Sequence, residues 1–330
     1  MMRSNIIGMG YAVPDRVVTN SDLEKIMDTT DEWIVTRSGI QERHWVEDGT
    51  GTSDLAEAAS RKAMKMASVS PEEIDLVIVA TLTSDYFFPG IGNQLQEKLG
   101  LRNIGTFDIK VACSAFIYGL SIGDQFIKTG QHNTVLVVGA EVQSTALDLS
   151  TEGRDISVLF GDGAGAVILR REEGESGILS THLHSQGRYL KELWCEAPAS
   201  RFNPRISKEM IDERRHLPYM NGREVFRNAV KRFPEVINEA LDANHLDLED
   251  VKLIIPHQAN LRISQAVGKR LGTAPGVVYS NIHKYGNTTG ASIPIALTEA
   301  YQEGKFTKGD IVILAAFGAG FTWASAAIRW

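Results

Sequence analysis

The stretch TFDIKVACSAFIYGLSIGDQFIKTG, residues 106–130, decides the fold of this 330-residue chain. Thr106–Val111 has the pattern of a buried β-strand and Ser114–Lys128 that of an amphipathic helix, which places Cys113 on the first turn of the helix. Unpaired N–H groups and the positive end of the helix dipole favour a thiolate there, and a thiolate is the nucleophile of acyl transfer. The alternative is a small buried core residue, which is what most free cysteines are. This segment alone leaves both interpretations open.

An internal duplication surrounds this stretch. SPEEIDLVIVAT, from Ser70, aligns with LDLEDVKLIIPH, from Leu246, so that Ser70 falls on Asp247 (247 − 70 = 177), and two further segments share the same gapless offset of 177 residues (290 − 113 = 177). The pairs at this offset are Ile74 and Val251, Cys113 and Gly290, and Val135 and Val312. Agreement over three separate segments predicts two similar halves.

The two predicted halves cover residues 1–171 and 172–330, and the second carries an irregular inserted loop region at about 180–222. Within each half, short β-branched runs alternate with helical patterns, which is typical of a mostly buried sheet covered by helices. If the helices of the two halves pack together, the result is an α/β fold in five layers, α-β-α-β-α.

The second half of the chain contains two further side chains that could take part in catalysis. His257 comes directly after a buried strand that ends at Pro256, the usual place for a functional residue in an α/β fold. Asn287 lies in the turn that opens the counterpart of the Cys113 helix. A structural histidine and a helix N-cap are the alternatives. If the halves pack about a pseudo-twofold axis, the two helix starts approach each other and Cys113, His257 and Asn287 converge.

Such a convergence suits decarboxylative carbon–carbon bond formation. The cysteine would take an acyl group from a thioester, while the histidine Nε2 and the asparagine amide donate hydrogen bonds to the enolate left when a malonyl unit loses carbon dioxide.

Composition excludes several other classes of protein. The net charge of −7 and the lack of a basic run argue against nucleic acid as a partner. The two cysteines, Cys113 and Cys195, exclude a disulfide scaffold, and no spacing typical of a metal site occurs. MMRSNIIGMGYAVP at the N-terminus lacks an apolar run long enough for a signal peptide, and no segment predicts a membrane span. We therefore expect a protein of the reducing cytoplasm, without membrane partners.

The motifs together resemble the β-ketoacyl-acyl carrier protein synthase III family of the thiolase superfamily, essentially from end to end. The motifs that carry the resemblance are DTTDEWIVTRSGI at 28–40, VACSAF at 111–116, FGDGAGA at 160–166, PHQANLR at 256–262, YGNTTGAS at 285–292 and FGAGFTWASA at 317–326. The resemblance implies a homodimeric thiolase-fold enzyme with Cys113, His257 and Asn287 as catalytic residues. It implies an oxyanion hole from the backbone N–H groups of Cys113 and Ala319.

The same resemblance implies the substrates and their sites. The substrates are acyl-CoA, with acetyl-CoA favoured, and malonyl-acyl carrier protein, and the product is a 3-oxoacyl carrier protein that initiates fatty acid biosynthesis. No tightly bound cofactor is implied, since coenzyme A enters as a thioester substrate. The residues implied are Trp33, Arg37, Arg154 and Asn260 for coenzyme A, Phe88 and Phe226 for the acyl pocket, and Arg262, Lys269 and Arg270 for docking of the carrier protein. Trp33 as a core aromatic, and the three basic residues as a solvated helix face, are the structural alternatives.

Two features depart from the family pattern. Arg223 stands in MNGREVF where an asparagine is common, and the loop 189–219 is longer than in housekeeping members. Trp194, Cys195 and Phe202 of this loop are candidates for lining the acyl pocket. A specialised relative with a longer acyl-CoA primer, or one making a secondary metabolite, is therefore the rival hypothesis. A thiolase is disfavoured because it needs a second cysteine as base, and a non-catalytic subunit because all three catalytic residue types are present.

Overall fold

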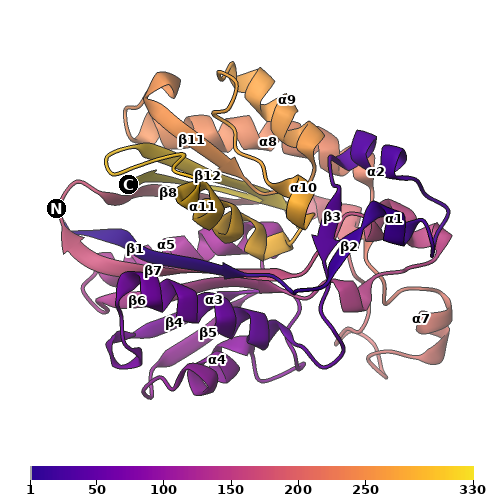
Figure 1. Cartoon of the computed structure of the whole chain (residues 1–330). Coiled ribbons are helices and arrows are strands. Elements are labelled where there is room, and N and C mark those ends of the chain that lie inside the picture. The colour runs from indigo at the N-terminus through magenta and orange to yellow at the C-terminus, as the bar shows by residue number, and fades with distance from the viewer. Residues whose placement is uncertain (1) are drawn as a thin grey trace.

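The computed structural model describes residues 2–330 and has five layers, with two β-sheets separated by a central pair of helices and covered by further helices outside (Figure 1). The layered α/β fold predicted from the sequence is confirmed.

Each sheet comes mainly from one half of the chain. The first has five strands in the order β1-β7-β6-β4-β5 and the second has four in the order β11-β12-β13-β8. The strands of the first are β1 Met2–Ala12, β7 Gly163–Glu173, β6 Thr134–Glu141, β4 Leu76–Ala80 and β5 Gly105–Ile109; those of the second are β11 Val251–Pro256, β12 Ile311–Gly318, β13 Thr322–Arg329 and β8 Gly177–Ser185. In both sheets, the parallel pairs lie at one end and the antiparallel pairs at the other.

The central layer consists of α5, Ala115–Lys128, and α11, Ser292–Gln302. Alternate residues of each strand face this layer: Val135 and Val137 of β6 pack into one core with Val312 and Leu314 of β12. The residues between them face outward into two separate cores. This period-2 alternation of residues that are all apolar is what a sheet covered on both faces requires.

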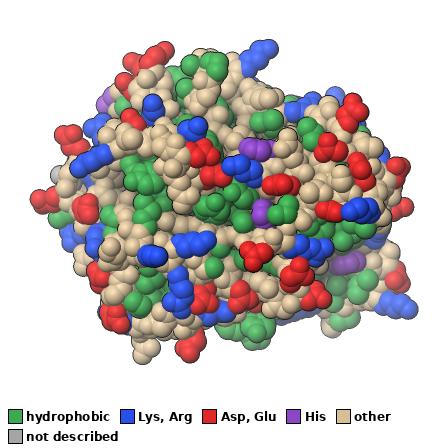
Figure 2. Space-filling model, viewed as in Figure 1, with side chains coloured by type: hydrophobic (Ala, Val, Ile, Leu, Met, Phe, Trp, Pro, Cys, Tyr) green, Lys and Arg blue, Asp and Glu red, His purple; other side chains and the backbone are tan. Residues whose placement is uncertain are grey.

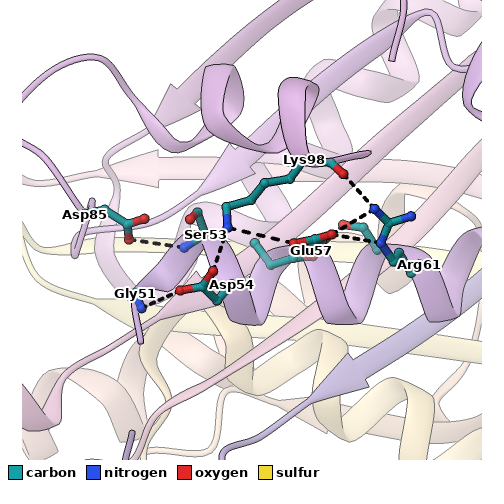
Figure 3. Close-up of polar contacts among 9 residues, drawn as sticks. Gly51, Ser53, Asp54, Glu57, Arg61, Asp85 and Lys98 are labelled. Atoms are coloured by element: carbon teal, nitrogen blue, oxygen red, sulfur yellow. Dashed lines mark hydrogen bonds and ion pairs between the residues drawn. The ribbon is translucent and has the colours of Figure 1, made fainter. Parts of the chain in front are cut away.

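The outer layers are α3, Thr52–Ala67, and α4, Ile91–Leu99, on the first sheet, and α8, Gly222–Ala243, and α9, Leu261–Leu271, on the second. Polar contacts fix the start of α3 (Figure 3). Asp54 accepts a hydrogen bond from Gly51 N–H at 2.8 Å and pairs with Lys98 of α4 at 2.6 Å, while Asp85 accepts from Ser53 N–H at 3.1 Å. These acidic side chains compensate the unpaired N–H groups of the helix start.

The predicted duplication has a direct structural counterpart. The short 3₁₀ turns η2, Ala112–Ser114, and η7, Thr289–Ala291, lie at the offset of 177 (289 − 112 = 177), and β6 and β12 match at the same offset. Ala112 and Thr289 even share a left-handed backbone, with φ of 46° and 48°. A non-glycine residue in this region carries strain, so both central helices are preceded by the same strained type of turn.

The remaining elements are short segments that connect the strands and helices described above. They are α1 Asn20–Leu23, α2 Asp31–Ser38, α6 Arg154–Ser157, α7 Lys208–Asp212, α10 Ile282–Tyr285, the pairs β2 Val17–Thr19 with β3 Glu42–His44 and β9 Leu193–Trp194 with β10 Tyr219–Met220, and the 3₁₀ turns η1 Pro71–Glu73, η3 Ser144–Ala146, η4 Thr151–Gly153, η5 Gly187–Glu192 and η6 Leu248–Asp250. The irregular loop region begins later than about 180, because β8 continues to Ser185 as a paired edge strand. The division of the chain near residue 171 stays a prediction.

The two halves meet so closely that some positions admit only glycine. A Cβ atom on Gly139, within β6, would lie 2.3 Å from the carbonyl oxygen of Gly290 at the start of α11. Gly187, in contrast, has nothing within 4 Å of a Cβ atom.

We therefore expect Gly139→Ala to destabilise the protein by about 2 kcal/mol, because backbone must shift to admit the methyl group. Gly187→Ala is the matched control and should leave stability unchanged. Denaturant unfolding of both variants measures the difference, and equal stability of the two would contradict this packing.

Candidate active site

A cavity of about 920 Å³ opens between α2, α6, α8, α9 and the ends of the two sheets. Cys113, His257 and Asn287 all line it, although they are far apart in the sequence. The predicted convergence of these three residues in space is therefore present in the structure.

Cys113 occupies the 3₁₀ turn between β5 and α5, two residues before the regular helix begins, and is 9% exposed. Gly318, at the end of β12, closes in on it: a Cβ atom on Gly318 would lie 2.8 Å from the Cβ of Cys113 and 3.2 Å from its sulfur. Glycine at 318 thus leaves the thiol room to face the cavity. Neither Cys113 N–H nor Ala319 N–H donates to an acceptor of another residue among residues 2–330.

The electrostatic environment of Cys113 differs from the prediction. Burial, together with the negative charge of Glu141, raises the pKa of the thiol to about 12. The helix start favours a thiolate less than the sequence suggests, since desolvation outweighs the partial charge of one short turn. The resting nucleophile is a neutral thiol.

Glu141 is the unanticipated member of this site. It is the last residue of β6 and fully buried, and its carboxylate accepts from Leu82 N–H at 3.1 Å and from the Thr83 hydroxyl at 2.7 Å. Burial raises the pKa of Glu141 to about 7. Glu141 and Gly318 are equivalents in the duplication, so the offset of 177 contained a signal that could have found both (318 − 141 = 177).

His257 follows β11 directly and is 2% exposed. Its Nδ1 lies 2.6 Å from Ser292 Oγ, whereas its Nε2 is buried and has no hydrogen-bond partner among residues 2–330. Burial lowers the pKa of His257 to about 3, so the ring is neutral at pH 7.

Asn287 is fixed through both backbone and side chain. Its N–H donates to Leu159 C=O at 2.8 Å, and its C=O accepts from Gly161 N–H at 3.2 Å. Its Oδ1 accepts from Thr289 N–H at 2.9 Å, which determines the orientation of the amide. Nδ2 is therefore the free donor at the cavity, with no acceptor among the described residues 2–330.

At the entrance to the cavity, Trp33 of α2 is covered by two guanidinium groups. The Cζ atoms of Arg37 and Arg154 lie 4.3 Å and 5.0 Å from its ring centroid. Arg154 also pairs with Asp28 at 3.7 Å. The sequence prediction grouped Trp33, Arg37 and Arg154, and the structure brings them together at the surface rather than placing Trp33 in the core.

The remaining predicted residues are divided between the cavity and the outer surface. Asn260 lines the cavity but caps α9, accepting from Arg262 N–H at 2.9 Å and donating to Arg37 C=O at 2.8 Å. Arg262, Lys269 and Arg270 are exposed on α9, and only Arg262 reaches the cavity. On the side shown in Figure 2, acidic and basic side chains are interspersed rather than segregated.

The two predicted acyl-pocket residues have different environments. Phe226 lines the cavity near Arg262, whose Cζ is 5.7 Å from its ring. Phe88 is 80% exposed and lies outside the cavity. Ala319 adjoins the cavity residue Gly318 without lining the cavity itself.

The long loop contributes side chains other than those expected. Leu193, Leu217 and Tyr219 line the cavity, whereas Trp194, Cys195 and Phe202 do not. Arg223 also lines it and has no ion-pair partner within residues 2–330. The pairing of β9 with β10 places Leu193 opposite Met220, which also lines the cavity, and two-residue strands leave no periodic signal in a sequence.

Within residues 2–330 no group of three or more His, Cys, Asp or Glu side chains has the geometry of a metal site. No helix in the described range is long and apolar enough to cross a membrane.

Comparison with known proteins agrees with this geometry. Residues 107–187 match the family model for 3-oxoacyl-[acyl-carrier-protein (ACP)] synthase III, and residues 241–330 match the model for its C-terminal part. A β-ketoacyl-[acyl-carrier-protein] synthase III from Rhodospirillum centenum is 46% identical over 333 aligned residues, covering 100% of this chain and 99% of the relative. The chain belongs to the 3-oxoacyl-[acyl-carrier-protein] synthase III family.

Solved structures of synthase III proteins agree in fold. The one from Aquifex aeolicus is 43% identical with a TM-score of 0.91 and covers 99% of this chain and 100% of its own. The one from Thermus thermophilus is 41% identical with a TM-score of 0.92, covering 99% of both chains. The thiolase-like fold and the assignment to the condensing enzymes, which are acyltransferases, are thus confirmed for this synthase III family member.

The buried charge of Glu141 provides a test of the electrostatics at Cys113. Glu141→Gln should lower the pKa of the thiol and speed its alkylation by iodoacetamide at pH 8 about fivefold, if the repulsion removed is ~1 kcal/mol. Peptide mass spectrometry separates Cys113 from Cys195. Glu213→Gln, which removes an exposed carboxylate at the same cavity, is the control and should have no effect. A slower or unchanged reaction of Cys113 in Glu141→Gln would contradict this account.

Proposed function

We propose that this enzyme transfers an acyl group from acyl-CoA to Cys113 and then condenses it with malonyl-acyl carrier protein, initiating fatty acid biosynthesis. The observation that carries the proposal is that one thiol and two unpartnered donors, His257 Nε2 and Asn287 Nδ2, line a single cavity. The relatives at 46% identity favour this role over a specialised pathway.

In the first step, the Cys113 sulfur attacks the thioester carbonyl and the bond between the acyl carbon and the CoA sulfur breaks. The thiol proton ends on the departing CoA thiolate, so the step is neutral overall. The backbone N–H groups of Cys113 and Ala319 stabilise the oxyanion that forms at the carbonyl.

In the second step, the malonyl carboxylate leaves as carbon dioxide and its electron pair forms an enolate. His257 Nε2 and Asn287 Nδ2 donate hydrogen bonds to the enolate oxygen, and both donors act in a buried site where such bonds are strong. The enolate carbon attacks the acyl group, and the released Cys113 thiolate takes up one proton. No carboxylate base is needed, because decarboxylation generates the nucleophile.

Coenzyme A fits the entrance of the cavity. Trp33 offers an aromatic face, and Arg37 and Arg154 offer planar cations that stack on a purine and pair with phosphate. An adenine stacked between the Trp33 ring and a guanidinium group separates these two planes by about 7 Å, twice the usual carbon contact distance. Because both guanidinium groups lie closer to the ring than this, one of them moves aside when adenine binds. Asn260 positions α9 against Arg37 at the same entrance.

Further parts of the proposal concern assembly. Phe88 is exposed, and in this proposal it closes the acyl pocket of a second copy in a homodimer, whereas Phe226 lines the cavity of its own chain. Arg262, Lys269 and Arg270 are exposed basic residues of α9, the first of them at the cavity, and their charge suits an acidic carrier protein. Acetyl-CoA as the starter and a cytoplasmic location also remain part of the proposal.

The three catalytic side chains have separable roles. Cys113→Ser should abolish the acyl-enzyme, because a hydroxyl is a far weaker nucleophile. His257→Ala and Asn287→Ala should each retain acylation but lose condensation by about 10²- to 10³-fold, as for the loss of one oxyanion donor. Intact mass after acetyl-CoA addition measures the first step, and carbon dioxide release the second.

Cys195→Ser is the matched control for that series and should retain both steps, since Cys195 lies outside the cavity. The assignment of roles is wrong if His257→Ala or Asn287→Ala blocks acylation while decarboxylation continues.

Trp33 provides a test of coenzyme A recognition. Trp33→Ala should raise the KM for acetyl-CoA about tenfold, through the loss of ~1.4 kcal/mol of stacking, and leave the KM for acetyl-pantetheine, which lacks adenine, unchanged. The control is Trp194→Ala, another tryptophan under a cation but outside the cavity. Equal effects of Trp33→Ala on both substrates would contradict an adenine site.

A further inference from the structure

The imidazole of His257 is held at one nitrogen and free at the other. Ser292 Oγ lies 2.6 Å from Nδ1, and Nε2 is the buried atom that lacks a partner among residues 2–330. The backbone N–H of His257 donates to Ala315 C=O at 2.8 Å, which fixes where the ring leaves the chain. Only the position of the ring proton remains to be determined.

The surroundings of Ser292 determine that position. Ser292 is the first residue of α11 and is 2% exposed. Its oxygen accepts a hydrogen bond from Gln258 N–H at 3.3 Å. Among residues 2–330, His257 Nδ1 is the acceptor that lies within hydrogen-bond distance of the Ser292 hydroxyl. The hydroxyl therefore donates to Nδ1, and the neutral ring carries its own proton on Nε2.

We infer that Ser292 is a positioning residue whose hydroxyl, by donating to Nδ1, holds His257 in the tautomer with its N–H at Nε2, directed at the cavity. The chemical purpose of this device rests on the function proposed above, because only an Nε2–H can donate to the enolate oxygen. In the other tautomer, the Nε2 lone pair would face that oxygen and repel it.

The tautomer matters here because the ring is uncharged. Burial lowers the pKa of His257 to about 3, so protonation at both nitrogens does not supply the donor at neutral pH. A neutral imidazole donates from one nitrogen only, and a hydrogen bond at the other nitrogen decides which one.

The second donor is set by the same short segment. Thr289 N–H donates to Asn287 Oδ1 at 2.9 Å, which leaves the Nδ2 group for the cavity. One turn, residues 287–292, thus orients both the amide and the imidazole, and it is the counterpart of the turn that carries Cys113.

Histidine-selective ¹⁵N NMR of the full-length enzyme tests the inference directly. Its readout is the tautomer of His257, with His257→Ala used to assign the signal. We expect Nε2–H in the wild type, and a mixture or Nδ1–H in Ser292→Ala. An Nδ1–H ring in the wild type, or an unchanged Nε2–H ring in Ser292→Ala, would overturn the inference.

Kinetics give the functional readout. Ser292→Ala should lower kcat for condensation about 10- to 100-fold, with the KM for malonyl-acyl carrier protein and the amount of acyl-enzyme unchanged. Ser292→Thr, which keeps the hydroxyl, should restore most of the rate. Ser60→Ala is the control. It also removes a buried hydroxyl, which donates a hydrogen bond to Ala56 C=O at 2.7 Å, but it does so in α3.

The role of Ser292 and the proposed function can fail separately. The expected tautomers in an enzyme without condensing activity would support the role of Ser292 and contradict the proposed function. Condensation at the wild-type rate in Ser292→Ala, with the donors His257 and Asn287 still required, would overturn the role of Ser292 alone.

Discussion

The close packing of two equivalent turns, each at the start of a central helix, is the constraint on which the rest of this structure depends. One turn carries Cys113 and the other opens α11, and glycine at 139 and 318 lets the backbones approach to distances that exclude a side chain. Because η2 packs against the end of β12 and η7 packs against β6, the polar groups of both turns are held by the two sheets rather than by a mobile loop. The thiol, the imidazole and the amide thereby reach one cavity from distant parts of the chain.

The two turns have the same backbone conformation, but the strand ends beside them carry different residues. Beside Cys113 the end of β12 is Gly318, which leaves space for a substrate carbonyl. Beside the equivalent Gly290 the end of β6 is Glu141, whose carboxylate oxygen would lie 3.4 Å from a Cβ atom on Gly290. The duplication thus kept one turn open to the cavity and filled the other with a buried acid, which in turn raises the pKa of Cys113.

Much of this could be predicted from the sequence, and the reasons for the rest are physical. The offset of 177 residues located both turns, since it reflects backbone geometry that both halves need. The ionisation of Cys113 could not be predicted, because it depends on burial and on Glu141, which is distant in sequence. The bonds that orient His257 and Asn287 depend on side-chain rotamers, and the cavity residues Leu193 and Met220 depend on a pairing of two-residue strands.

The central claim is that two fixed donors and one thiol act on a shared substrate in a single cavity. A crystal structure of the acylated enzyme with a non-hydrolysable malonyl thioester analogue tests this most directly. The account predicts that the thioester oxygen of the analogue lies within ~3.2 Å of both His257 Nε2 and Asn287 Nδ2, with its methylene carbon facing the acyl group on Cys113. An oxygen bound to neither donor, or an Asn287 amide with Oδ1 toward it, would contradict the account.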